Sequence, residues 1–345
     1  MSEIRVAIIG VGNVASTLVQ GIHFYNDKKD NGLWHNTIGG YKAPDIKIVS
    51  AFDINPDKIG IDISEAIFKD GERRYVDVNY MDIEVSNGIL SDNIPSHLKD
   101  VITVKNDSND EVLKIMKESK PDIVINLISS GMDNSSKKYA ECSLESNASF
   151  VNTTSTQLMK TEFTQKFTDA GLLFVGDDLM SQFGSTAFHK GIIDLMVQRG
   201  MKVKKSYQLD VGGSLETLNS TDENIKAKKR AIKTSTINTE APYEFDSVVG
   251  TTEYTDFLND SRISYYWIYG EGFLNSPTII DVTLRSNDGA HACNVLFDVV
   301  RAIKYCKDNN KLSLNNTICA YGFKNPPNTS KIRDSYTNFV NTFVI

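Results

Sequence analysis

The feature that most constrains the fold is a glycine-rich turn near the start of the chain. It reads Val6-Ala-Ile-Ile-Gly10-Val-Gly12-Asn-Val-Ala15-Ser16, an apolar β run followed by Gly-x-Gly-x-x-Ala and a helical pattern. Gly10 permits the tight turn, Gly12 lets backbone approach a pyrophosphate, and Ala15 allows close packing of helix on strand. The helix N-terminus adds free N–H groups and partial positive charge. The segment predicts a unit that binds a nicotinamide or flavin nucleotide. The alternative is a glycine turn that only reverses the chain.

An acidic residue marks the end of the second predicted strand. That strand covers residues 46–52 and ends at Asp53. An acid at this position hydrogen-bonds the hydroxyls of the adenosine ribose, usually about 20 residues after the glycines. We interpret the polar stretch from Asn26 to Lys47 as an insertion that lengthens this interval. A carboxylate there repels a 2′-phosphate, which favours NAD over NADP. The alternative is that Asp53 only starts the turn that leads to Pro56.

Composition excludes several classes of protein. A chain of 345 residues suits two domains or one domain with a large insertion. Its net charge of −7 argues against nucleic acid or an anionic membrane as a partner. No segment approaches the roughly 18 apolar residues of a membrane span, and the first strand begins too early for a secretory signal. Four scattered cysteines and five isolated histidines predict a cytoplasmic protein with reduced thiols and no metal site.

The first half of the chain alternates helical and strand patterns. We expect helices over 110–120, 136–147 and 161–170, and strands over 122–128, 149–152 and 172–176. Such alternation predicts a parallel, doubly wound sheet of the α/β class. Ser129 follows the strand over 122–128, and open α/β sheets bind ligands beyond the carboxyl ends of their strands. We therefore expect Ser129 to contact the cofactor.

The pattern changes after about residue 200. Residues 206–211, 264–269 and 277–284 alternate and are rich in β-branched and aromatic side chains, which indicates an open antiparallel sheet with helices on one side. A helical pattern resumes over 291–308. We expect a Rossmann-type domain over residues 1–200, rejoined by 291–345, and an α+β catalytic and oligomerisation domain over 201–290.

Three polar clusters lie outside the glycine turn. The first is Gly176-Asp-Asp178, two adjacent acids beyond a strand. The second is the basic run 226–233, in which Lys229 and Lys233 share one helix face through their i, i+4 spacing. The third is a set of separated polar positions that includes Arg262, Asp288 and Lys324. Taken alone, the basic run is typical of a solvated helix face.

The order of these pieces resembles the inositol-phosphate synthase family, especially its shorter archaeal and bacterial type, from end to end. The matching segments are the glycine turn with Leu18-Val-Gln-Gly21, Ala51-Phe-Asp53, Lys58-Ile-Gly60, Phe150-Val-Asn152, Phe167-Thr-Asp-Ala-Gly171, Val175-Gly-Asp-Asp178, Val211-Gly-Gly213, Leu218-Asn219, Lys229-x-x-x-Lys233-Thr234, Asp298-Val-Val-Arg-Ala302 and Lys324-x-Pro-Pro327. The resemblance implies a homotetrameric, NAD-dependent isomerase that converts D-glucose 6-phosphate to 1D-myo-inositol 3-phosphate. The steps it implies are oxidation at C5, enolisation, intramolecular aldol closure and reduction at C5, without net redox change.

The resemblance also implies roles for individual residues. Lys229 and Lys324 would serve the C5 oxygen and proton transfer, Arg262 would lie near the C1 oxygen and Lys233 near the phosphate, with Asp288 as the catalytic-site aspartate. The cofactor would contact Gly10, Gly12, Asn13, Val14, Asp53, Ser129, Asp178 and Ser181, and the substrate would lie near Asn219. Cations suit this chemistry because its intermediates are anionic, and lysine acts as acid or base when its surroundings lower its pKa. Some family members also use a divalent cation or ammonium.

Three positions depart from the family pattern. Met180 stands where lysine is common, and Asp210 and Ser214 stand where asparagine is expected. The strand-end loop, usually Leu-Pro-x-Gly-Ser, is Ile128-Ser-Ser-Gly-Met132. These changes remove polar contacts beside the substrate. They leave open a related cyclase for another aldose or ketose phosphate. An ordinary dehydrogenase and an NAD-binding regulatory protein without turnover are further alternatives.

Overall fold

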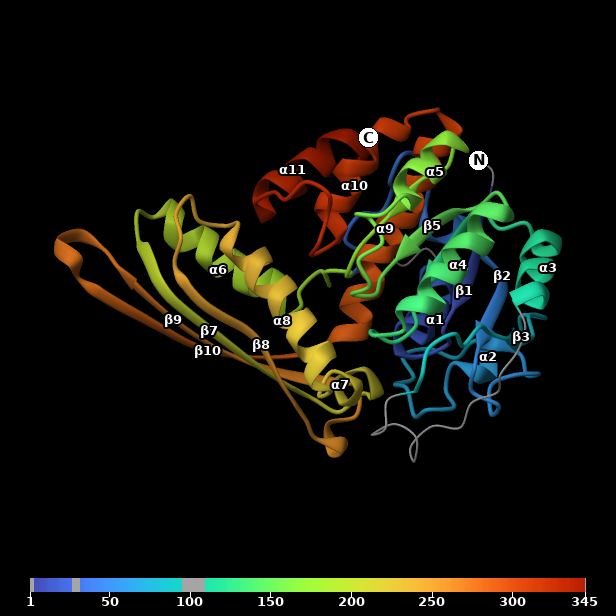
Figure 1. The fold of residues 1–345 in the computed structure, drawn as a ribbon, viewed down its shortest axis with the longest axis horizontal. Coiled ribbons are helices and arrows are strands. Elements are labelled where there is room, and N and C mark those ends of the chain that lie inside the picture. The colour runs from blue at the N-terminus through green and yellow to red at the C-terminus, as the bar shows by residue number, and fades with distance from the viewer. Residues whose placement is uncertain (1–2, 27–31, 95–108, 345) are drawn as a thin grey trace.

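The computed structural model describes residues 3–26, 32–94 and 109–344, and Figure 1 shows their arrangement. Its first unit is a six-stranded parallel sheet in the order β3-β2-β1-β4-β5-β6. The strands are β1 (Ile4–Ile9), β2 (Ile46–Asp53), β3 (Val85–Asn87), β4 (Ile123–Asn126), β5 (Ser149–Asn152) and β6 (Phe174–Val175). This is the strand order of dinucleotide-binding doubly wound sheets, so the predicted α/β class is confirmed.

Helices cover this sheet, which explains why its central strands are buried on both faces. Every residue of β4 and β5 is buried. The helices of this unit are α1 (Asn13–Asn26), α2 (Ile63–Ala66), α3 (Asn109–Ser119), α4 (Asp133–Glu145), α5 (Phe163–Asp169), α9 (Asp288–Asp308), α10 (Asn315–Gly322) and α11 (Ile332–Phe343). α9 packs on α1 and β1, as expected for a helix that rejoins the first domain. It begins at Asp288, earlier than predicted.

The second unit is a four-stranded sheet in the order β10-β9-β7-β8. Its elements are α6 (Ser185–Gln198), β7 (Lys202–Gly212), α7 (Leu215–Asn219), α8 (Glu223–Asn238), β8 (Asp246–Tyr254), β9 (Ser261–Glu271) and β10 (Pro277–Asn287). β9 is antiparallel to both β7 and β10, whereas β8 is parallel to β7. The predicted antiparallel sheet is therefore a mixed one. A helical crossover through α7 and α8 joins β7 to β8, and such a connection brings two strands together in parallel.

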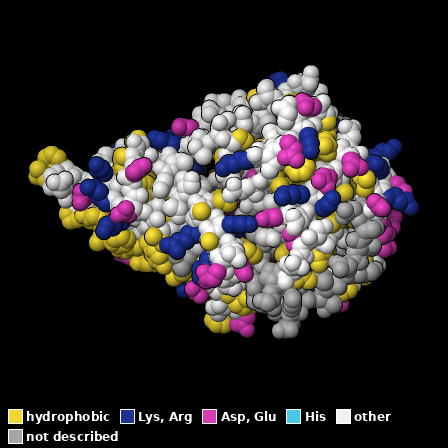
Figure 2. Space-filling model, in the orientation of Figure 1, with side chains coloured by type: hydrophobic (Ala, Val, Ile, Leu, Met, Phe, Trp, Pro, Cys, Tyr) yellow, Lys and Arg dark blue, Asp and Glu magenta, His cyan; other side chains and the backbone are white. Residues whose placement is uncertain are grey.

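α6 and α8 lie over one face of this second sheet (Figure 1). Its core joins Ile193 and Met196 of α6 to Val203, Ile237, Val249 and Ile268. Because α6 contributes to this core, the second unit begins near Ser185, whereas the sequence placed residues up to 200 in the first domain. No described helix covers the other face, and hydrophobic side chains line that edge of the molecule in Figure 2.

The described part of the predicted insertion is anchored on the C-terminal helices. His35 Nδ1 and Asp298 Oδ2 of α9 are 2.7 Å apart, and Trp34 stacks on Tyr336 of α11. Residues 27–31 of the insertion lie outside the described part of the chain. None of the described helices has the length and apolar character that a membrane span requires.

Candidate functional site

One cavity of about 650 Å³ lies between the carboxyl ends of the first sheet and the second unit. Every residue that the sequence assigned to the site lines this cavity, except Asn219. The lining includes the glycine turn and Asp53 from the first unit and Lys229, Lys233 and Arg262 from the second. The fold thus brings both predicted groups, for cofactor and for catalysis, to a single space.

The glycine turn has the shape that a pyrophosphate requires. Gly10 has φ +86°, and a Cβ there would lie 3.0 Å from the backbone of Leu127, so the turn excludes any side chain. A Cβ at Gly12 would have no neighbour within 4 Å. That open space lies before the N-terminus of α1, whose free N–H groups attract anions. The residues present therefore fit the phosphates of a dinucleotide.

Asp53 is held beside this turn by backbone groups. Its Oδ2 accepts the N–H of Val11 at 2.7 Å, and its Oδ1 accepts the N–H of Asn55 at 2.9 Å. Each carboxylate oxygen has a further lone pair. These contacts fix the carboxylate at the carboxyl end of β2, the position from which an acid binds a ribose in dinucleotide-binding sheets.

A charge cluster around the buried Lys58, beside Asp53, was missed by the sequence analysis. Lys58 Nζ donates to the carbonyl of Val11 at 2.7 Å, pairs with Asp70 and lies 3.8 Å from Glu72. Burial raises the pKa of Glu72 to about 7. Lys58 belongs to a segment that matches the family, but nothing local to that segment reveals its partners, which follow 12 and 14 residues later.

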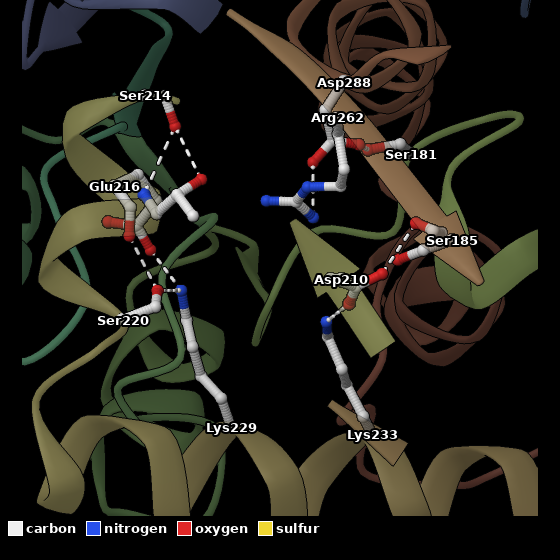
Figure 3. Close-up of polar contacts among 12 residues, drawn as sticks. Ser181, Ser185, Asp210, Ser214, Glu216, Ser220, Lys229, Lys233, Arg262 and Asp288 are labelled. Carbon is white, nitrogen blue, oxygen red and sulfur yellow. Dashed lines mark hydrogen bonds and ion pairs between the residues drawn. The ribbon is translucent and has the colours of Figure 1, made fainter. Parts of the chain in front are cut away.

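The four predicted cations are each paired with a carboxylate. The pairs are Lys229–Glu216, Lys233–Asp210, Arg262–Asp288 and Lys324–Asp178. Lys229 and Lys233 extend from the same side of α8, as their spacing predicted, and reach two different carboxylates (Figure 3). The site is therefore balanced in charge at these positions. This balance cannot be predicted from the local sequence, because the pairs join residues from different elements.

Asp288 links the start of α9 to β9 and to the loop after β6. Its Oδ2 lies 3.0 Å from Arg262, and its Oδ1 accepts the hydroxyl of Ser181 at 2.7 Å. Burial acts to raise the pKa of Asp288, but Arg262 and the Ser181 hydrogen bond outweigh it, and the pKa lies below its usual range. Asp288 is thus an ionised acceptor at neutral pH.

The two adjacent acids after β6 have different surroundings. Asp177 is fully buried, accepts from Asn152 Nδ2 and from the N–H of Met159, and has a pKa raised by burial to about 7. Asp178 lines the cavity and accepts from Lys324 Nζ at 2.6 Å. The backbone N–H of Lys324 also donates to the carbonyl of Asp178 at 2.8 Å, which fixes the two segments together.

Glu216 is a cavity residue that sequence reasoning missed. It accepts from Lys229 Nζ, and also from the hydroxyl and N–H of Ser130 at 2.8 and 3.2 Å. Lys229 Nζ donates to Ser220 as well, at 2.7 Å. Glu216 thus ties the second unit to the loop after β4. An acid in the first turn of a helix is common for electrostatic reasons alone, so its sequence position gives no distinct signal.

Asn219, which the sequence analysis expects near the substrate, is the one predicted site residue that lies behind the cavity wall. Its side chain is fully buried, does not line the cavity, and donates from Nδ2 to the carbonyl of Ser130 at 2.5 Å. Met180 is also buried and outside the cavity lining. Ser214 caps α7 by accepting the N–H of Thr217. Asn219 thus shapes the loop behind the cavity, whereas Ser214 both caps α7 and lines the cavity.

The N-terminus of α6 opens on the cavity. Its N-cap residue, Gly184, provides no side-chain cap, and Ser185 and Thr186 line the cavity. The Thr186 hydroxyl is buried and has no hydrogen-bond partner within the described residues. Free N–H groups, a helix dipole and an unpaired hydroxyl together suit an anionic group such as a phosphate. No group of three or more His, Cys, Asp or Glu residues in the described ranges is arranged to hold a metal ion.

Comparisons with known proteins show which sequences and folds this chain is similar to. A sequence model of the family described as myo-inositol-1-phosphate synthase matches residues 184–289, which span the second unit from the start of α6 to the first turn of α9. A solved structure of a myo-inositol-1-phosphate synthase-related protein from Thermotoga maritima has the same fold, with a TM-score of 0.82, 22% identity and coverage of 98% of both chains.

Two curated relatives are similar over nearly their whole length. The inositol-3-phosphate synthase of Mycobacterium tuberculosis (strain CDC 1551) is 32% identical over 336 residues, which cover 94% of this chain and 92% of that protein. The inositol-3-phosphate synthase of Mycolicibacterium smegmatis is 33% identical over 339 residues, covering 94% of this chain and 93% of that protein. Since this identity spans both units and the cavity between them, the chain belongs to the inositol-3-phosphate synthase family.

Proposed function

We propose that the protein is an NAD-dependent isomerase that converts D-glucose 6-phosphate to 1D-myo-inositol 3-phosphate. The observation that carries this proposal is the single cavity that joins a pyrophosphate-shaped glycine turn to four cations. Bound NAD would supply reversible hydride transfer at C5, so that the overall conversion would involve no net redox change. The relatives named inositol-3-phosphate synthase support the same reaction.

The chain's own residues would hold the two ligands at opposite ends of the cavity. Gly12 and the start of α1 would receive the pyrophosphate, and Asp53 the ribose hydroxyls. The N-terminus of α6, with the unpaired Thr186 hydroxyl, would receive the sugar phosphate. Lys233, at the cavity wall, would add a charge beside that phosphate. The C5 position of the sugar would then lie between these two ends.

The remaining cations would serve the reacting oxygens. Lys229 and Lys324 would hold and transfer protons at the C5 oxygen, and Arg262 would stabilise the C1 oxygen as the ring closes. Their carboxylate partners, Glu216 and Asp178, face the same cavity and would keep the lysines charged before substrate binds. Preorganised charges of this kind stabilise developing oxyanions without reorganisation.

The test is NMR of the purified protein with glucose 6-phosphate and a substoichiometric amount of NAD, followed through phosphorus and proton signals. Inositol phosphate in excess of the NAD supplied would establish a cofactor-recycling cyclase. Lys229→Ala and Lys324→Ala should each reduce turnover by at least about 10²-fold, as expected for loss of a proton-transfer group, with NAD affinity nearly unchanged by calorimetry. Full turnover in both variants would refute the assignment.

A second candidate is a related cyclase that acts on another aldose or ketose phosphate. Two observations favour it. Met180, where the family commonly has lysine, contributes no cation to the cavity, and Asp210 adds a carboxylate in an ion pair with Lys233 where the family pattern has an uncharged asparagine. A panel of hexose and pentose phosphates distinguishes the two reactions, and a clear preference for glucose 6-phosphate would count against this second candidate.

A further inference from the structure

One of the four ion pairs around the cavity differs from the other three. In the pairs of Lys229, Arg262 and Lys324, both the cation and its carboxylate line the cavity. In the fourth pair, Lys233 lines the cavity but Asp210 does not, and Asp210 is only 1% exposed. A substrate anion can therefore displace the carboxylate from each of the first three cations. It cannot displace Asp210 from Lys233 in this way, because Asp210 lies behind the cavity wall.

Asp210 is held in place by several donors besides Lys233. Lys233 Nζ donates to its Oδ2 at 2.7 Å, Ser264 Oγ donates to its Oδ1 at 2.6 Å, and Gln208 Nε2 lies 2.9 Å from both oxygens. Gln208 is itself fixed by His189, whose Nδ1 is 2.9 Å from Gln208 Oε1. Gln208 and Asp210 alternate on the buried face of β7. The carboxylate thus has no freedom to turn away from Lys233.

The other groups around Lys233 do not favour its charged form. The pKa of Lys233 lies below its usual range, because burial lowers it most and Arg262 from β9 and Lys324 from the segment after α10 lower it further, while Asp210 raises it. His189 on α6 is buried, its pKa is lowered to about 4, and it is neutral at pH 7. Within the described residues, Asp210 is the only carboxylate ion-paired with Lys233.

We propose that Asp210 is a positioning residue that keeps Lys233 as a fixed ammonium group on the cavity wall. Lys233 then acts as a permanent cation toward an anionic group of the substrate and not as a general base. Lys229 and Lys324, whose carboxylate partners face the cavity, remain the lysines that exchange a carboxylate for substrate and transfer protons. Only the identity of the substrate anion rests on the proposed function. An asparagine at this position, as expected from the family pattern, would supply hydrogen bonds without the charge.

The protonation of Lys233 can be measured without any turnover. Trace acetic anhydride labels neutral amines, and mass spectrometry of the peptide that holds Lys233 gives its labelling midpoint as the pH is varied. We expect Asp210→Asn to lower that midpoint by about one to three pH units, as for the loss of an adjacent opposite charge. The matched control is Glu271→Gln, which removes the carboxylate of the surface pair with Lys204 and should leave the Lys233 midpoint unchanged.

A second variant, Ser264→Ala, tests the same proposal if Asp210→Asn does not fold. Ser264→Ala removes one hydrogen bond from Asp210 and should lower the Lys233 midpoint in the same direction by a smaller amount. If the protein turns over a sugar phosphate, the basic limb of its pH–kcat profile should move with the labelling midpoint. An unchanged midpoint in the folded variants would overturn the proposal. A shifted midpoint without turnover of glucose 6-phosphate would contradict the proposed function alone.

Discussion

At the scale of single residues, the two glycines of the first turn are required for different reasons. Gly10 has a left-handed φ and no room for a Cβ, whereas Gly12 has room that faces the cavity. We expect Gly10→Ala to destabilise the fold by about 1–3 kcal/mol through backbone strain. Gly12→Val should leave stability within about 1 kcal/mol but weaken NAD binding by at least about tenfold, because the side chain occupies the pyrophosphate space.

Denaturant unfolding and calorimetric titration with NAD separate these two effects. Each variant serves as the control for the other, since both add a side chain to the same turn. Equal losses of stability in both variants would contradict the view that Gly10 serves the fold and Gly12 serves NAD binding.

Buried carboxyl groups make the stability of the fold depend on pH. The pKa of Glu72 is raised by burial from 4.5 to about 7, and that of Asp177 from 3.8 to about 7. A carboxyl with a raised pKa in the folded state binds its proton more tightly there. Its contribution to stability is therefore present below the unfolded pKa and is lost as pH rises to the folded pKa. We expect the free energy of unfolding to fall between about pH 4 and pH 7 from these two groups.

In the Glu72→Gln variant, the free energy of unfolding should fall by on the order of 2 kcal/mol less between about pH 4 and pH 7 than in the unsubstituted protein. The contribution of Asp177 should remain. Urea denaturation at several pH values measures the slope directly. A slope as steep in the variant as in the unsubstituted protein would contradict the assignment to Glu72.

At the scale of elements, the anchor of the 32–45 segment on α9 depends on one buried network. Arg301 and Asp298 are both fully buried, their ion pair is 2.7 Å, and Arg301 also donates to backbone carbonyls of residues 35 and 36. Asp298→Ala leaves this guanidinium without its counterion. We expect a loss of about 3–5 kcal/mol of stability. Glu141→Gln, which breaks the exposed pair with Lys138, should cost less than about 1 kcal/mol.

Urea denaturation of both variants provides the comparison. If Asp298→Ala cost no more than the surface variant, the network would not anchor the segment.

The sequence predicts elements well where the signal is local and poorly where contacts across the chain decide. The glycine turn, β5 and the i, i+4 lysines of α8 were identified because each depends on neighbouring residues. β8 was missed, since Gly250 interrupts its alternation and causes a shift in register with β7. The parallel pairing of β8, the placement of α6 and the carboxylate partners of the cations arise only when distant segments pack.

At the scale of the whole molecule, the uncovered face of the second sheet is our candidate for assembly into a homotetramer. Tyr265, Trp267 and Tyr269 alternate along β9 on the face opposite the buried Tyr266 and Ile268, and Ile279 of β10 pairs beside them. Ile279 is 56% exposed, and Trp267 stacks with Tyr269. Contiguous apolar surface of this kind marks interaction sites. We propose that this face joins copies of the chain.

Sedimentation velocity should then give the mass of a tetramer for the unsubstituted protein. Trp267→Glu combined with Ile279→Glu should give smaller species, because both charges would be buried unpaired in the interface. The control is Leu195→Glu, which changes a side chain of similar exposure (59%) on α6, away from this sheet face, and should leave the assembly intact. A monomer before any substitution would contradict the role of this face. Since Arg262 and Asp210 lie on β9 and β7, loss of the assembly should also lower turnover if neighbouring copies hold the strands in register.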